Sequence, residues 1–179
     1  MERTKKYVKT FVTIGILAGV LFGLVMSRKM GFLNGLLAGI QFGSICAVLM
    51  ASVLIPLDYF MTRKLPAKAL DVNQVREIQV DGALDETFQK CVDLLKRCKT
   101  IKSVSPSKKE DFLISARTRA SIVSFGEEIT LHFQELTKGI IKIQISSKPA
   151  VPFTLLDYGK NFRNVELIRE KIESISTLS

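Results

Sequence analysis

Two long apolar stretches begin the chain, and a region of shorter alternating patterns follows them. Thr10–Ser27 contains 18 residues without a charged side chain, and Met30–Leu57 contains 28. A helix that crosses a bilayer needs about 20 apolar residues at a rise of about 1.5 Å per residue, so each stretch has roughly the required length. The pattern predicts a membrane-spanning hairpin over residues 10–60, with helices over about 10–27 and 34–57.

Short polar segments border the predicted hairpin. Residues 1–9 form a basic head, Ser27–Gly35 is predicted to be a tight turn with Arg28 and Lys29 at the surface, and residues 61–74 form a basic juxtamembrane linker. The basic start and the first apolar stretch also resemble a secretory signal peptide. The lack of a small-x-small cleavage site and the immediate second apolar stretch favour a retained helix.

From Val75 onward the apolar residues recur at the shorter spacings of a soluble α+β domain, which we place at residues 75–176. Strands are predicted where apolar and polar residues alternate, and helices where apolar residues recur every three or four positions. The predicted order is a strand at 76–80, a helix at about 83–98, strands at 101–105, 112–119, 129–134 and 141–146, and a helix from about 161 or 164 to 175. A βαββββα chain of this kind is expected to form one antiparallel sheet with its helices on one face.

Small residues recur at every fourth position within the apolar stretches. These helix-packing candidates are Gly15, Gly19 and Gly23 in the first stretch, and Gly31, Gly35, Gly39, Gly43, Ala47 and Ala51 in the second. In lipid, small residues at this spacing let helix backbones approach closely. Because four residues advance about 400° around a helix, successive positions drift by about 40°. We therefore expect one end of the longer ladder to pack on the first helix and the other end on a second copy, which predicts a homo-oligomer.

Charge is distributed unevenly along the chain. Residues 1–70 carry nine Lys and Arg against Glu2 and Asp58, a net charge of +7, whereas residues 71–179 carry 17 against 15, a net charge of +2. The near balance of the soluble part argues against nucleic-acid binding. The head has four positive charges, the linker side three and the turn two, so the positive-inside rule places both termini in the cytoplasm. The margin is small, and the opposite orientation stays open.

Residues that commonly catalyse reactions or bind metals are scarce. His132 is the single histidine, and Cys46, Cys91 and Cys98 have neither a CxxC nor another metal-ligand spacing. The chain also lacks G-x-S-x-G, H-E-x-x-H and a phosphate-binding glycine loop. We expect reduced thiols, no metal, no cofactor and no catalytic residue.

The acidic pairs Glu110–Asp111 and Glu127–Glu128 lie beside predicted turns, where water is expected to reach them, so they are poor general acids. In the second apolar stretch, Gln41, Ser44 and Ser52 are expected to form interhelical hydrogen bonds, and pore lining is the alternative. Asp58 is expected to meet Arg63 or a lipid headgroup.

Two motifs in the soluble part resemble those of a widespread bacterial domain family of unknown function. The closing motif is D-x-G-x-N-x-R-x-V-E-x-I-R from Asp157 to Arg169, and the upstream element is R-x-R from Arg117 followed by F-x-E-E-I from Phe125. The similarity covers about residues 75–173. The chain departs from the family in the PAVPFTLL insert before Asp157 and in having Glu pairs where Asp is usual.

The resemblance implies a fold unit and no known activity. It directs attention to five polar residues, which are Arg117, Arg119, Asp157, Asn161 and Arg163. These residues are candidates for a shared ligand or partner surface. A structural Asp–Arg network that fixes the last loop is the alternative.

These observations together predict a self-associating protein of the bacterial inner membrane. The expected role is non-enzymatic: a scaffold or accessory subunit that presents a cytoplasmic α+β domain to a partner such as another membrane protein. The alternatives are a small homo-oligomeric channel gated by the cytoplasmic domain, and a sensor of a lipid or small ligand.

Overall fold

The computed structural model describes residues 2–107, 112–121, 124–152 and 154–176. It divides into two compact units, one that ends at Leu70 and one that begins at Asp71. Each unit is described by itself.

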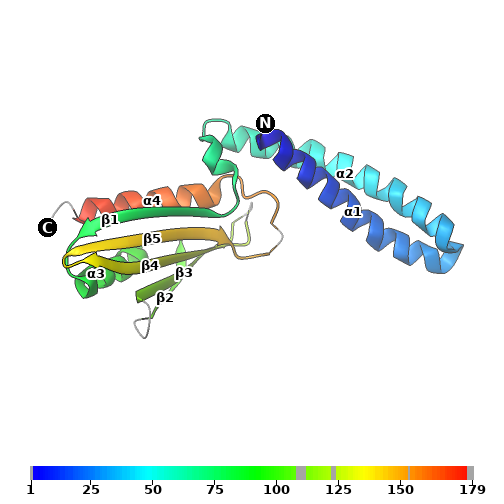
Figure 1. Cartoon of the computed structure of the whole chain (residues 1–179). Coiled ribbons are helices and arrows are strands. Elements are labelled where there is room, and N and C mark those ends of the chain that lie inside the picture. Colours follow the sequence, from blue (N-terminus) through cyan, green and yellow to red (C-terminus); the bar gives the residue numbers. More distant parts are fainter. Residues whose placement is uncertain (1, 108–111, 122–123, 153, 177–179) are drawn as a thin grey trace. The chain divides into compact units, whose positions relative to one another are not determined.

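The first unit is a hairpin of two long apolar helices, α1 (Glu2–Met30) and α2 (Phe32–Thr62), shown in blue and cyan in Figure 1. The predicted turn over Ser27–Gly35 is too long, because the helices are interrupted only at Gly31. The backbone of Gly31 has a φ of 84°, which is a left-handed conformation that glycine adopts without a steric penalty. A single residue can therefore reverse the chain.

Both helices extend past the predicted limits at the open end of the hairpin. The basic head is helical from Glu2, and α2 continues beyond Pro56 as far as Thr62. Long apolar helices tolerate an internal proline when neighbouring groups compensate for the lost hydrogen bond. A short 3-10 helix, η1 (Ala67–Leu70), lies within the segment predicted as a linker.

The second unit is a five-stranded antiparallel sheet with two helices. Its elements are β1 (Gln74–Asp81), α3 (Leu84–Arg97), β2 (Ile101–Ser107), β3 (Phe112–Thr118), β4 (Glu127–Thr137), β5 (Ile140–Pro149) and α4 (Lys160–Ser176). The strands lie in the order β1-β5-β4-β3-β2, as Figure 1 shows. The predicted α+β class and the order βαββββα are confirmed.

One face of the sheet supplies the core of this unit. In the register of the strands, Ile78 is opposite Ile143, Ile143 is opposite Phe133, and Phe133 is opposite Phe112, so these side chains share a face. The same cluster of apolar side chains includes Phe88 and Leu95 of α3 together with Val165, Ile168 and Ile172 of α4. Both helices therefore cover the same face, and the opposite face carries the alternating polar residues.

Two of the three cysteines belong to α3 or its end. Cys91 is fully buried in the core, and burial raises the pKa of its thiol to about 12. Cys98 and Cys46 are partly buried, and all three thiols are free. Cys91 thus acts as a small apolar side chain and not as a nucleophile.

Candidate functional site

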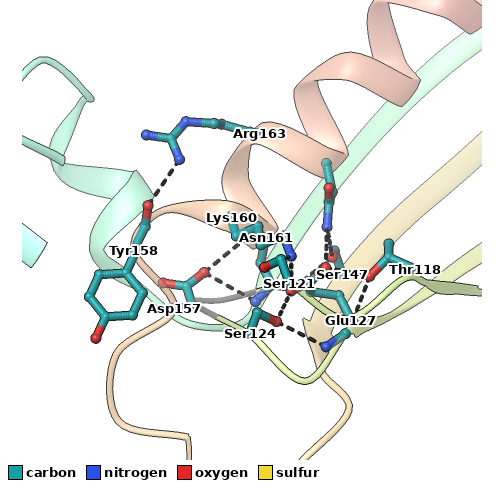
Figure 2. A network of polar contacts seen from close by, with 12 residues as sticks. Thr118, Ser121, Ser124, Glu127, Ser147, Asp157, Tyr158, Lys160, Asn161 and Arg163 are labelled. Carbon is teal, nitrogen blue, oxygen red and sulfur yellow. Dashed lines mark hydrogen bonds and ion pairs between the residues drawn. The ribbon is translucent and has the colours of Figure 1, made fainter. Parts of the chain in front are cut away.

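A group of buried polar side chains lies where the sheet meets the start of α4 (Figure 2). Its buried members are Thr118, Glu127, Ser147, Asp157 and Asn161. Burial of a polar group is costly unless the group is hydrogen-bonded. Each hydrogen bond in this group therefore shows how the surrounding segments are held.

The side chain of Asp157 caps the start of α4. Its Oδ1 accepts a hydrogen bond from the backbone N–H of Gly159 at 3.2 Å, and its Oδ2 accepts from the backbone N–H of Asn161 at 3.0 Å. An aspartate in this position satisfies N–H groups that have no partner inside the helix. Tyr158 and Gly159 both have positive φ, of 56° and 70°, so the carboxylate also stabilises a tight backbone turn.

Asn161 connects this turn to the sheet. Its amide nitrogen donates to Asp157 Oδ2 at 3.1 Å, and its carbonyl oxygen accepts from the hydroxyl of Ser147 at 2.6 Å. The Ser147 oxygen also accepts from the amide of Asn164 at 3.4 Å. The first turn of α4 is therefore hydrogen-bonded to β5 through side chains.

Glu127 is the most enclosed acid of the group, with 1% of its surface exposed. Its carboxylate accepts hydrogen bonds from the hydroxyls of Thr118 and Ser124, and the ammonium of Lys160 lies 3.2 Å from Oε1. The expectation that the Glu127–Glu128 pair is open to water is wrong for Glu127. Successive side chains of β4 point to opposite faces of the sheet, so Glu128 points outward and Glu127 points towards α4. The burial of Glu127 therefore follows from its place in the paired strand β4 and not from the turn next to it.

The five residues singled out by the resemblance lie in two kinds of surroundings. Asp157 and Asn161 contact each other inside the buried group, whereas Arg117 and Arg119 are exposed at the end of β3. Arg163 is also exposed and donates to the backbone carbonyl of Tyr158 at 3.1 Å, to one side of the group in Figure 2. Sequence reasoning missed the central role of Glu127 because its hydroxyl partners, Thr118 at the end of β3 and Ser124 in the following loop, are brought to it by the fold and by no local pattern.

A pocket of about 350 Å³ lies beside the buried group. Its lining includes Phe125, Glu127, Pro149, Leu156, Asp157 and Tyr158. The carboxylates in its lining already accept hydrogen bonds from the protein, as described above. Among the described residues, no buried side-chain nitrogen or oxygen lacks a hydrogen-bond partner. The group is therefore built to hold two loops in place.

In the hairpin, the glycine ladders of α1 and α2 face each other. A Cβ atom added to Gly43 would lie 2.4 Å from the carbonyl oxygen of Gly15, and one added to Gly39 would lie 2.6 Å from that of Gly19. These distances are too short for any side chain, so the backbones are in direct contact. The helices run antiparallel, so the glycines of α1 lie against the glycines of α2 in the same chain.

This arrangement corrects two expectations about the ladder. All five small residues from Gly35 to Ala51 are buried within one chain, so the ladder needs no second copy to cover it. A four-residue period is longer than the 3.6 residues of a helical turn, so the row of small residues drifts around each helix. Two helices that wind about each other can keep such rows in contact over this length. Gly31 is not a packing residue, since no atom lies within 4 Å of its added Cβ and its role is in the turn.

A polar cluster closes the open end of the hairpin. Asp58 is fully buried and accepts hydrogen bonds from Lys6 Nζ at 3.2 Å and from the Tyr7 hydroxyl at 3.1 Å, while Arg3 donates to the backbone carbonyl of Thr62 at 2.7 Å. The expected pairing of Asp58 with Arg63 or a headgroup is therefore wrong. The antiparallel course of the helices brings Asp58 beside residues about 50 positions earlier in the chain.

A groove of about 470 Å³ follows one side of the glycine contact and is lined almost entirely by apolar atoms. The expected interhelical hydrogen bonds of the serines are not formed within the hairpin. Ser44 donates to the carbonyl of Ile40 at 2.8 Å, and Ser52 donates to that of Leu49 at 2.7 Å. Both hydroxyls are thus satisfied by their own helix.

Comparison with known proteins places the chain in no family, because no family model and no curated protein matches it. Solved structures that are similar at low identity include the following two. The di-domain ARO/CYC StfQ from the steffimycin biosynthetic pathway is 10% identical with a TM-score of 0.32, over 77% of this chain and 57% of StfQ. A protein of unknown function from Staphylococcus aureus is 15% identical with a TM-score of 0.24, over 60% of this chain and 98% of that protein. Likenesses this remote support no argument about fold or function.

Proposed function

We propose that this protein is an integral protein of the bacterial inner membrane, with the α1–α2 hairpin across the bilayer and both termini in the cytoplasm. The burial pattern of the hairpin carries the proposal. The two helices bury glycine and alanine between them and expose their large apolar side chains. The exposed residues include Ile16, Leu17, Val20, Leu21 and Leu24 in α1, and Leu36, Leu37, Ile40, Ile45 and Leu49 in α2. Apolar surface of this extent is unfavourable in water and suited to hydrocarbon.

Extraction of membranes tests the insertion. The full-length chain is expected to stay with the membrane fraction after an alkaline carbonate wash and to enter solution only with detergent. Release by carbonate would refute the proposal. Protease added to inside-out vesicles is expected to digest the α+β domain, and protection of the domain there with digestion in right-side-out vesicles would reverse the orientation.

The proposed role is binding, as a scaffold or accessory subunit that presents the α+β domain to a partner. The buried carboxylates support this role, because Glu127 and Asp157 are committed to hydrogen bonds that hold the protein's own loops. The sheet face opposite the helices offers a polar surface, where Glu77 is opposite Gln144 and Gln144 is opposite His132. A second membrane protein is expected to co-purify with the full-length chain and to be lost when residues 71–179 are deleted. Equal recovery with and without this region would refute the role.

Self-association is the second part of the proposal. It depends on the apolar groove, because the small residues of α2 are already buried against α1. The groove borders closely packed backbones, and Val12, Val20 and Ile40 stand along it. We expect a helix of a second copy to fill it. The variant Ile40→Trp should lower the mass of the detergent-solubilised protein measured by light scattering, whereas Leu37→Trp should not. A monomeric mass for the unmodified chain would refute this part.

A further inference from the structure

We propose that two neighbouring loops of the α+β domain, which present Phe125 and Val151, insert into the surface of the bilayer that holds the hairpin. The inference rests on the proposed membrane insertion. Its partner is the lipid surface itself, recognised through exposed apolar side chains at the interface between headgroups and acyl chains.

The first observation is the exposure of these side chains. Phe125 is 78% exposed and Val151 is 41% exposed, although both adjoin the buried polar group. They are adjacent, because the backbone N–H of Ala150 donates to the carbonyl of Gly126 at 3.0 Å. Phe125 precedes Gly126 and Val151 follows Ala150, so the two apolar residues flank this hydrogen bond, and both line the same pocket. Together the two side chains form a small exposed apolar patch, and contiguous apolar patches are candidates for interaction surfaces.

The second observation is that the residues around Phe125 are held by hydrogen bonds. Ser121 and Ser124 exchange backbone hydrogen bonds, and the hydroxyl of Ser124 donates to the carboxylate of Glu127 and accepts from the N–H of Gly126 at 3.0 Å. Gly126 has a φ of 96°, and its added Cβ would lie 2.9 Å from the carbonyl oxygen of Thr118. The buried polar group therefore holds Phe125 in its outward position, and less conformational entropy is lost when Phe125 is bound.

The third observation is the point at which the chain enters the domain. Gln74, the first residue of β1, is opposite Ser147, and Glu127, the first residue of β4, is opposite Pro149. The loops thus lie at the end of the sheet where the chain arrives from the hairpin. Only residues 63–73 separate α2 from β1, a segment that spans at most about 40 Å when extended. The β4–β5 turn lies at the other end of the sheet, about 30 Å of strand from the point where the chain enters the domain.

The tether and the exposed side chains together favour lipid as the partner. The covalent connection keeps this end of the domain close to any bilayer that contains the hairpin, so the effective lipid concentration at Phe125 is high. Aromatic side chains are enriched at the membrane–water interface.

The absence of tryptophan from the chain allows a direct test. Three single-tryptophan variants of the full-length protein, Phe125→Trp, Leu136→Trp and Leu49→Trp, are reconstituted into vesicles with brominated acyl chains and into unbrominated controls. Leu136 is the matched control, because it is a 44% exposed apolar residue near the opposite end of β4. Leu49 is 62% exposed in α2 and reports on insertion of the hairpin.

Brominated lipid is expected to quench most of the emission of Phe125→Trp and Leu49→Trp and little of that of Leu136→Trp. Equal weak quenching at positions 125 and 136, with strong quenching at position 49, would overturn this inference and leave the proposed function intact. A blue-shifted but unquenched Phe125→Trp would also overturn it, since that result identifies a protein contact. Weak quenching of Leu49→Trp would instead refute the membrane hairpin.

Discussion

The hairpin and the α+β domain bury opposite kinds of residue. In the hairpin, α1 and α2 meet through glycine and alanine, and their leucine, isoleucine and valine side chains face outward. In the domain, isoleucine, leucine and phenylalanine fill the space between the sheet and its helices. Water favours burial of large apolar side chains, whereas hydrocarbon does not, so helices in lipid associate through close backbone contact. The difference is the one expected if the hairpin lies in lipid, as proposed above, and the domain lies in water.

The two parts also use buried polar groups differently. In the hairpin, one cluster around Asp58 joins the helices at their open end. In the domain, the group around Glu127 and Asp157 holds two loops that are far apart in the chain. The first stabilises the pairing of helices, and the second shapes a surface.

The largest effect should come from filling the glycine contact. In Gly43→Leu, even the Cβ would lie 2.4 Å from the carbonyl oxygen of Gly15, and backbone cannot move aside without separating the helices. We expect the hairpin to open, measured as a longer distance between spin labels on α1 and α2. Ser44→Leu changes the exposed neighbour and should leave the distance unchanged. An unaltered distance in Gly43→Leu would show that the helices do not meet through this face.

The next effect should come from breaking the buried ion pair of the hairpin. Asp58→Ala leaves Lys6 beside Tyr7 without its carboxylate, and loss of one partner of a buried pair costs about 3 kcal/mol. Unfolding in mixed micelles measures the change. Replacing both partners, in Lys6→Leu with Asp58→Leu, should restore much of the stability, and a double variant as unstable as the single one would contradict a pairing role.

Truncation of a large apolar side chain should destabilise the domain strongly and the hairpin little. Ile143 is fully buried in β5, and Ile143→Ala should lower the free energy of unfolding by about 2–5 kcal/mol, measured by urea denaturation of the full-length protein. Gln144→Ala is the control on the other sheet face. In the hairpin, Leu49→Ala should change helix pairing little, because Leu49 faces outward. A large effect of Leu49→Ala on pairing would contradict the difference in solvent.

Two adjacent glutamates allow the stability contribution of a buried carboxylate to be compared with that of an exposed one. Glu127→Ala removes the acceptor of the Thr118 and Ser124 hydroxyls and should cost about 1–3 kcal/mol of unfolding free energy. Glu128→Ala removes an exposed ion pair with Lys148 and should cost about 1 kcal/mol at most. Equal losses in the two variants would show that the buried group does not stabilise the domain.

The smallest effect concerns pH. Burial would raise the pKa of Glu166, but hydrogen bonds from Arg76 and Arg169 outweigh it and hold the pKa below its ordinary value. A lowered carboxyl pKa stabilises the fold above the unfolded-state value of about 4.3, and the contribution is lost as pH falls through the folded-state value. Glu166→Gln should therefore narrow the gap in stability between pH 7 and pH 3 by about 1 kcal/mol at most, since the pair is partly exposed. An unchanged difference in stability between pH 7 and pH 3 would show that this ion pair does not contribute to acid sensitivity.

The sequence alone was sufficient for features that depend on local patterns. Apolar length and charge predicted the two long helices, although not their ends, and the change from fourth-residue to alternating periodicity predicted the element order of the domain. These features are readable because a helix or strand buries one face at a fixed period.

Only the tertiary structure decided what depends on contacts between distant segments. The pairing of Asp58 with Lys6 follows from the antiparallel return of α2, and the burial of Glu127 follows from the register of β4 with its neighbours. The match of Gly43 with Gly15 replaced the expected contact with a second copy. The periodicity of apolar or small residues predicts which face of a helix or strand is buried. Which segment covers that face depends on how the chain folds back.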